Sequence, residues 1–426
     1  MTVEVGGQTA VVLNDYDLIK SCYQSNIFNG RPKLCAFETA FGLGAGIGTG
    51  QHLHWREQRR LAVSTLRTIQ FGEGITMAGI VEAEAGKLLD DLAQHKGRPL
   101  NLTHILPKAV CNIVCAFVFG KPFEYSDPRY ILMLWLVYQN FKLAGPSAVV
   151  YSSGFLAKLP FGPGKRLVDN LRAFKQFAED HIAEHRESFD GAHIRDFIDA
   201  YLLKIEESRT GSMEESEVYK HLNLVWCVND LFGAGTETTA GTLRWAFLYM
   251  VLYPNVQKRI QDELDCVVGR GRMPVLRDKE NLPYVEAAIQ EINRHADIGP
   301  MGVAHATTEE TQLLGYTIPK GTLTMANAHL CHFNEEYFEN PRQFNPDRFI
   351  NSDGSFIKRE EVIAFSIGKR TCPGEELARM ELFFFLTHIL HRYEVTIAEG
   401  SPRPTLEGYT SITRVPHPYM VQLKER

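Results

Sequence analysis

The stretch FSIGKRTCPG, residues 365–374, constrains the interpretation of the chain more than any other part of it. Its two glycines and one proline favour a tight backbone loop. The helix-forming run EELARMEL, residues 375–382, follows directly, so we expect Cys372 to lie at the N-terminus of a helix. Unpaired N–H groups and the helix dipole favour a thiolate there, which is the form of cysteine that ligates metals.

The five fixed positions of the pattern Phe-x-x-Gly-x-Arg-x-Cys-x-Gly are all present, as Phe365, Gly368, Arg370, Cys372 and Gly374. A lone cysteine before a helix is by itself most simply a buried structural residue. The complete pattern, however, resembles the haem-binding loop of the cytochrome P-450 superfamily. The resemblance implies haem b as cofactor, with the Cys372 thiolate as the axial ligand to iron. It also implies that Phe365, Arg370 and Gly374 belong to the cofactor site.

Composition and charge limit the other classes of function. The 426 residues are 44% hydrophobic and 23% charged, so a large core is expected, although length alone suggests two or three domains. The net charge of -6, with no long basic run, argues against a nucleic-acid partner. The eight cysteines form no C-x-x-C pair, which is typical of reduced thiols in a protein that faces the cytosol.

The start of the chain and one later segment bear on membrane contact. No run of about 18 apolar residues is present, and residues 2–13 around Gly6-Gly7 are expected to form a hairpin. Membrane-bound relatives carry an anchor helix before this hairpin, so the chain resembles a form without its anchor. The apolar segment from Val149 to Phe161 suggests a ligand entry route or peripheral membrane contact. The segment from Arg195 to Ala200 resembles microsomal drug- and lipid-metabolising members, which implies the cytosolic face of the endoplasmic reticulum membrane.

Two further segments are candidates for cofactor binding. Trp55 and Arg59 stand four residues apart, so they share one face of a predicted helix. Such a pair can be a simple cation–π contact, but the resemblance implies that both side chains, together with His305 and Arg370, bind the haem propionates. A glycine at every second position from Gly42 to Gly50 fits no nucleotide fingerprint and predicts a flexible loop on the substrate side.

A helical pattern runs from about Glu215 to Tyr253, and Pro254 ends it. Its interior, LFGAGTETT at residues 231–239, contains two glycines and several threonines, which predicts a locally opened helix. A packing groove for another helix is the alternative interpretation. The resemblance implies that Glu237 and Thr238 form a proton route and are the catalytic residues. It also places Ala234, Pro300 and Val303 in the substrate pocket.

Glu291 and Arg294 stand three residues apart on another predicted helix. Such pairs are common on protein surfaces, but the family buries a Glu-x-x-Arg pair against an arginine like Arg348. We therefore interpret these three residues as structural.

The resemblance thus implies a mainly α protein with small β-sheets, in which one domain, residues 1–426, forms a helical prism that encloses haem. The expected function is a haem-thiolate monooxygenase that inserts one atom of O2 into an apolar fatty acid, steroid or xenobiotic. No dinucleotide fingerprint is present, so electrons are expected to come from a partner protein. The resemblance implies that this partner is an NADPH-dependent reductase, with cytochrome b5 as a second candidate. The alternatives are a haem-thiolate isomerase or dehydratase, and a non-catalytic haem protein such as a gas sensor.

Overall fold

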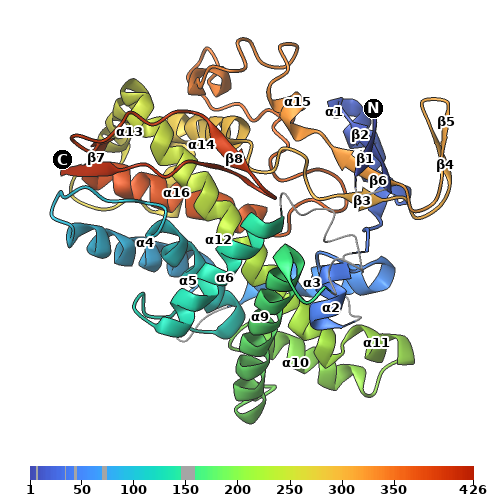
Figure 1. Ribbon diagram of the computed structural model, residues 1–426. Coiled ribbons are helices and arrows are strands. Elements are labelled where there is room, and N and C mark those ends of the chain that lie inside the picture. The colour runs from blue at the N-terminus through green and yellow to red at the C-terminus, as the bar shows by residue number, and fades with distance from the viewer. Residues whose placement is uncertain (6–7, 34, 43–45, 70–73, 145–158) are drawn as a thin grey trace.

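The computed structural model describes residues 1–426 except 6–7, 34, 43–45, 70–73 and 145–158 (Figure 1). Its helices are α1 (Tyr16–Gln24), α2 (Cys35–Phe41), α3 (His52–Thr68), α4 (Met77–Ala93), α5 (Leu106–Phe119), α6 (Pro128–Ala144), α9 (Gly162–Glu187), α10 (Phe197–Ser208), α11 (Met213–Val218), α12 (His221–Leu252), α13 (Pro254–Val267), α14 (Pro283–Ala296), α15 (Ala328–His332) and α16 (Glu375–Arg392). Short 3-10 helices span Ile27–Asn29, Leu276–Asn281 and Pro346–Phe349. The predicted class, mainly α with small sheets, is confirmed.

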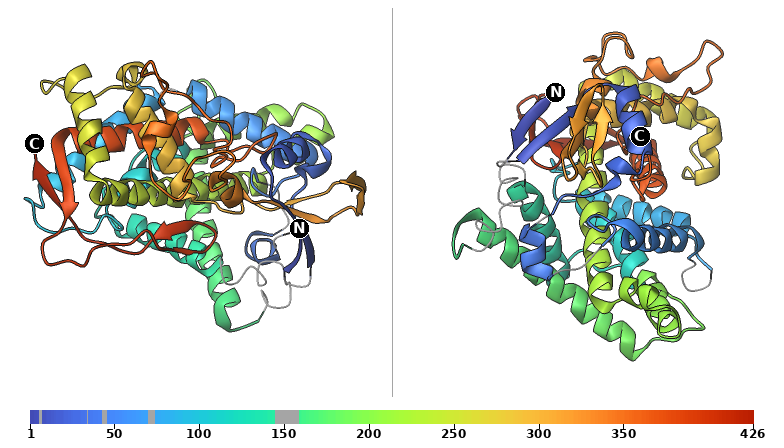
Figure 2. Two further views of the ribbon diagram at one scale, coloured as in Figure 1. Left: turned by 90° about the horizontal axis from the view of Figure 1, so that it is seen from above. Right: turned by 90° about the vertical axis from the view of Figure 1, so that its right-hand side faces the viewer.

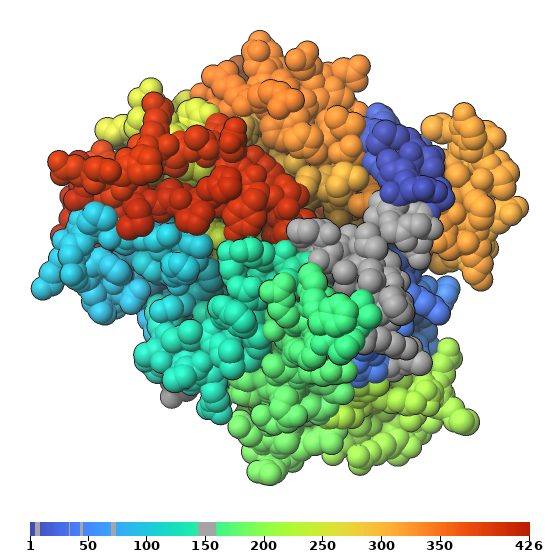
Figure 3. Space-filling model, viewed as in Figure 1, coloured from blue at the N-terminus to red at the C-terminus, as the bar shows by residue number. Residues whose placement is uncertain are grey.

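The strands are β1 (Thr2–Val5), β2 (Gln8–Leu13), β3 (His305–Ala306), β4 (Thr311–Leu313), β5 (Tyr316–Ile318), β6 (Leu323–Ala326), β7 (Tyr393–Ile397), β8 (Gly408–Thr410), β9 (Arg414–Pro416) and β10 (Val421–Glu425). The largest sheet has the order β1-β2-β6-β3. The predicted hairpin is confirmed, because β1 and β2 pair antiparallel, while β2 pairs parallel with β6 and aligns Leu13 with Ala326. The blue N-terminal strands therefore lie beside orange chain from after residue 300 in Figure 3.

The helix α12 runs through the centre of the molecule (Figures 1 and 2). It is apolar around most of its circumference, and its core residues include Trp226, Phe232, Trp245 and Phe247, each at most 1% exposed. A helix that is hydrophobic all round is expected to be buried by its neighbours. Its neighbours here are chiefly α5, α14 and α16, so α12 and the helix that follows Cys372 pack directly against each other.

The predicted helix from Glu215 to Tyr253 is wrong in two respects. Its first turns form the separate helix α11, because Ser212 and Glu215 make a capping box and Lys220 then adopts an extended conformation before α12 begins. The interior of α12 is also helical without a break through residues 231–239, although an opening was expected there. The threonine hydroxyls bond back to carbonyls one turn earlier, and the helical pattern tolerates these bonds.

Among the described residues, no helix has both the length and the apolar composition needed to cross a membrane. Most of the apolar segment from Val149 to Phe161 lies outside the described residues. Phe161, which the structure does describe, is 69% exposed immediately before α9.

Candidate functional site

The loop before α16 is fastened to α1 through its first glycine. Gly368 has a φ of 78°, and a Cβ added there would lie 2.1 Å from the carbonyl oxygen of Tyr23. The next amide, that of Lys369, donates to the same oxygen at 3.3 Å. The loop closes on itself where the amide of Cys372 donates to the carbonyl of Phe365 at 2.9 Å. Only glycine fits at position 368, and the contact with α1 fixes the place from which Cys372 projects.

Cys372 stands three residues before Glu375, the first residue of α16, and Gly374 is the N-cap. Burial raises the pKa of its thiol, and the N–H of Gly374 and the cation of Arg59 lower that pKa only in part. Burial thus opposes the thiolate form that the helix terminus was expected to favour. A metal cation at the sulfur supplies the missing charge compensation.

Three arginines far apart in the sequence, Arg31, Arg59 and Arg370, lie near one another, and Arg59 also acts on the Cys372 thiol. Burial, together with repulsion from Arg31 and Arg59, lowers the pKa of Arg370 to about 9. Burial likewise lowers the pKa of Arg31 to about 10. The guanidinium of Arg370 lies 4.1 Å from the ring centre of Trp55, and its Nη1 is buried without a partner in the part of the chain that the structure describes. Three desolvated cations with an unpartnered N–H form a site for an anion.

His305 borders the same cluster. It is 1% exposed and stacks on Tyr23 with 3.9 Å between the ring centres. Its Nδ1 donates to the carbonyl of Phe28 at 2.7 Å, so Nε2 carries no proton in the neutral ring. Burial, reinforced by Arg31, lowers the pKa of His305 to about 3. His305 therefore does not add a fourth positive charge at neutral pH.

The sequence analysis missed Arg31. Its guanidinium donates to the carbonyls of Gly48, Val303 and Ala304 at 2.9 to 3.2 Å. The only signal for it was an arginine between a glycine and a proline, which is an ordinary turn composition. Its position shows only when the segment after α1 is placed beside the chain that leads into β3.

One narrow face of α12 is accessible in an otherwise buried helix. Ala234 is exposed and Thr238 is partly exposed, and the Thr238 hydroxyl donates to the carbonyl of Ala234 at 2.7 Å. Asp230 lies one turn earlier on the same face, where its carboxylate accepts the amide of Gly48 at 2.9 Å. Burial raises the pKa of Asp230 to about 6. This face thus carries a small residue, a hydroxyl and a carboxyl at successive turns.

The other two candidate pocket residues, Pro300 and Val303, lie between α14 and β3. Val303 is 63% exposed, and its carbonyl accepts from Nη1 of Arg31 at 3.2 Å. The carbonyl of Pro300 accepts the amide of His329 at 3.1 Å. The segment therefore borders the arginine cluster through its backbone.

The structure does not place Glu237 on the accessible face with Thr238. The Glu237 carboxylate is 5% exposed and forms an ion pair with Arg244, 2.8 Å from Nη2. Burial raises the pKa of Glu237, and Arg244 lowers it in part. Adjacent residues of a helix point about 100° apart, so the acid and the hydroxyl face different surroundings.

Glu291, Arg294 and Arg348 come together in a buried network. Arg294 binds both Glu291 oxygens, at 2.6 and 2.8 Å, and Arg348 Nε lies 3.2 Å from the same carboxylate. Arg294 also donates to the carbonyl of Pro341 at 2.8 Å, so the network ties α14 to the chain before the Cys372 loop. A bidentate pair with these further bonds satisfies the buried charges.

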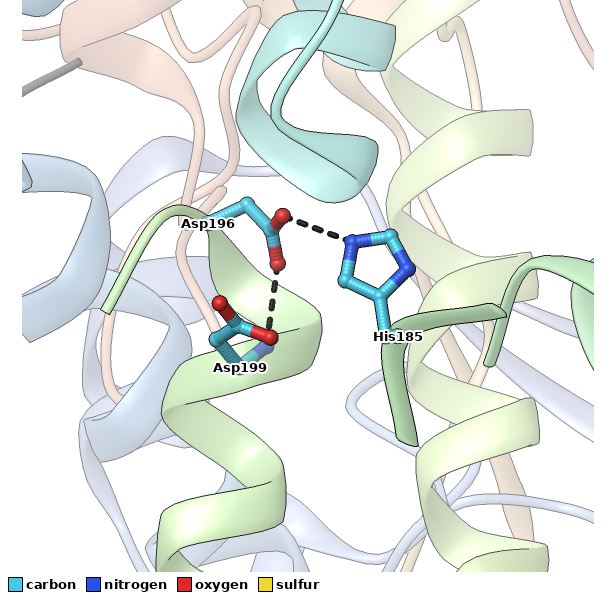
Figure 4. Close-up of side chains that lie close together, drawn as sticks. All are labelled: His185, Asp196 and Asp199. Atoms are coloured by element: carbon cyan, nitrogen blue, oxygen red, sulfur yellow. Dashed lines mark hydrogen bonds and ion pairs between the residues drawn. The ribbon is translucent and has the colours of Figure 1, made fainter. Parts of the chain in front are cut away.

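A second polar cluster consists of His185, Asp196 and Asp199 (Figure 4). His185 and Asp196 line a cavity of about 470 Å³. Both nitrogens of His185 face oxygen acceptors, the His181 carbonyl at 2.6 Å and Asp196 at 2.7 Å. Burial lowers the pKa of His185, but its bond to Asp196 and the other contacts outweigh burial and raise the pKa. Arg195 already binds both oxygens of Asp199. Because both ring nitrogens of His185 and both oxygens of Asp199 are engaged within the protein, this cluster is a closed polar network between α9 and α10.

Comparisons with known proteins identify the family of the chain. The family model described as Cytochrome P450 matches residues 1–423. The chain is 35% identical to mouse Cytochrome P450 2U1 and 38% identical to rabbit Cytochrome P450 2B4, over 99% and 95% of its length. These alignments cover 80% and 81% of the two relatives. The chain therefore belongs to the cytochrome P450 family of haem monooxygenases.

Proposed function

We propose that residues 1–426 form one haem-thiolate domain that oxidises an apolar organic substrate of the fatty acid, steroid or xenobiotic type. The observation that supports this best is the arginine cluster of Arg31, Arg59 and Arg370 beside Cys372. A cation beside the buried Cys372 thiol would stabilise its thiolate form, and an anion would balance the charges of the buried arginines. Both requirements arise at one site. Haem has an iron cation at its centre and two carboxylates at one edge, so it answers both needs.

Each residue of the site then has a role towards haem. Cys372 is the ligand to iron, and the loop from Phe365 to Gly374 presents it. The cations of Arg31, Arg59 and Arg370 neutralise the propionates. The indole of Trp55 stacks under Arg370 and keeps its guanidinium in place.

Bound haem supplies the chemistry of O2 activation. The protein positions the substrate, excludes water from the site and delivers protons. Ala234 leaves room beside α12 for O2 and substrate. The Thr238 hydroxyl accepts or donates a proton at the accessible face, and its bond to the Ala234 carbonyl orients it. Glu237 is a buried acid that forms an ion pair with Arg244. It acts on the proton route of Thr238 either through its charge or by a rotation of its side chain away from Arg244.

Pro300 and Val303 complete the apolar wall opposite α12 in this proposal. The exposed side chain of Val303, next to the cationic cluster, is available to a ligand that lies between haem and the chain before β3. We propose Glu291, Arg294 and Arg348 as structural residues, because their network fastens α14 to the segment that leads into the Cys372 loop.

The electron donor is a NADPH-dependent reductase, with cytochrome b5 as a further partner, and the location is the cytosolic face of the endoplasmic reticulum membrane with peripheral lipid contact. The relatives in the cytochrome P450 2 group support this part of the proposal. Turnover of NADPH with a reductase separates the monooxygenase from a gas sensor. Product formation without any electron donor is the mark of an isomerase or dehydratase.

The test is Cys372→Ser, with Cys266→Ser as the matched control, because Cys266 is an exposed cysteine on α13. Cys372→Ser should abolish the far-red-shifted Soret band of the reduced carbon monoxide complex, and the control should keep it. A retained band in Cys372→Ser contradicts the proposed iron ligand.

A further inference from the structure

The short segment Phe28–Arg31 lies inside the arginine cluster and is bonded on two sides. Nδ1 of His305 donates to the Phe28 carbonyl at 2.7 Å. Nε of Arg370 donates to the Asn29 carbonyl at 3.0 Å. The backbone of Asn29 therefore stands between two residues that border the anion site.

The side chain of Asn29 is buried, at 8% exposed, yet neither Nδ2 nor Oδ1 has a hydrogen-bond partner among the residues that the structure describes. The same holds for Nη1 of Arg370 and for the hydroxyl of Thr49. Nη2 of Arg370 donates at 2.7 Å to the carbonyl of Gly50, the residue after Thr49. Buried amides are rarely left without a partner, so a group of unpartnered donors around one guanidinium points to a shared ligand.

Asn29 lies two residues before Arg31, and the Gly30 between them is fixed against β3, because its carbonyl accepts the amide of Ala306 at 2.9 Å. Asn29 is neutral, so it adds a donor without adding to the repulsion among the three arginines. A neutral donor there suits a carboxylate whose charge is already balanced.

We propose that Asn29 is a direct ligand of a haem propionate, to which its Nδ2 donates a hydrogen bond. This proposal rests on the proposed function, since it requires haem at the site. Thr49, which precedes Gly50 and is also unpartnered, is the next candidate donor on the same side of Arg370.

The experiment compares two cofactors in the same holoprotein, protohaem and its dimethyl ester, in which the propionates carry no charge. The measured quantity is the rate of cofactor loss to excess apomyoglobin. Asn29→Ala should accelerate the loss of protohaem about 10-fold and leave the loss of the ester unchanged, because a bond to a charged acceptor is the stronger kind. The matched control is Asn26→Ala, in the same segment, whose side chain bonds Lys369 instead.

Equal acceleration for both cofactors, or none for either, overturns the proposal. Asn29→Asp keeps the shape of the side chain and guards against misfolding of the alanine variant. Its carboxylate should repel the propionate and release protohaem faster, but not the ester. Failure of the proposed function is seen separately, as a parent protein without the far-red-shifted carbon monoxide band.

Discussion

Replacing Gly368 by alanine tests whether the contact with α1 fixes the Cys372 loop. A Cβ at this position would lie 2.1 Å from the oxygen and 2.5 Å from the carbon of the Tyr23 carbonyl. These are backbone atoms, so no side chain can rotate out of the way. A φ of 78° costs an L-residue roughly 1–2 kcal/mol, and overpacking adds about 1–3 kcal/mol. We expect a loss of about 2–5 kcal/mol in the free energy of unfolding, with displacement of Cys372.

Alanine substitutions at two other glycines separate the cost of the positive φ from the cost of the steric clash. Gly354 has a φ of 84° with no atom within 4 Å of an added Cβ, so Gly354→Ala should show only the backbone cost of roughly 1–2 kcal/mol. Gly374 has neither a positive φ nor a close protein atom, so the fold should tolerate Gly374→Ala. The assays are denaturant unfolding and the fraction of protein that shows the thiolate carbon monoxide band. The reasoning is refuted if Gly368→Ala is no less stable than Gly354→Ala and binds haem fully.

Three further predictions concern α12 and α14. Thr238→Ala should divert NADPH consumption from product to hydrogen peroxide, since a positioned proton donor contributes about 10²- to 10⁴-fold to the reaction rate. The control Thr236→Ala loses a similar hydrogen bond to a carbonyl one turn earlier, but Thr236 is buried, so its NADPH consumption should stay coupled to product formation. Glu237→Gln should cost about 3–5 kcal/mol of unfolding free energy, because it leaves Arg244 as an unpaired buried cation, and Glu237→Gln with Arg244→Met should regain much of that loss. Burial lowers the pKa of His295 from 6.5 to about 4, so the unfolded chain binds more protons between these values. This contribution to stability is complete above about pH 6.5 and is lost as the pH falls towards 4, and His295→Gln should reduce the slope of unfolding free energy in that range; an unchanged slope contradicts the assignment.

Features that depend on a few consecutive residues were predictable from the sequence. The loop of residues 365–374, the hairpin of residues 2–13 and the pairing of Glu291 with Arg294 follow from turn residues and from helical spacing. The bond from Cys372 to Phe365, the pairing of β1 with β2 and the Glu291–Arg294 ion pair are each contacts within one element or between adjacent ones. The identity of the cofactor, and the assignment of the separate motifs to one cofactor site, were predicted through the resemblance to a known family.

Features that depend on what lies beside a residue appeared only in the tertiary structure. Arg31, Arg59 and Arg370 are spread over the chain, so their common position is a result of packing. Glu237 forms an ion pair with Arg244 and does not share the surroundings of Thr238, because adjacent residues of a helix point in different directions. The pKa of the Cys372 thiol is raised, although its position before a helix suggested the opposite, because burial outweighs the N–H of Gly374 and the cation of Arg59. Local spacing thus determined which residues form each element, whereas desolvation and long-range contacts decided their charges and partners.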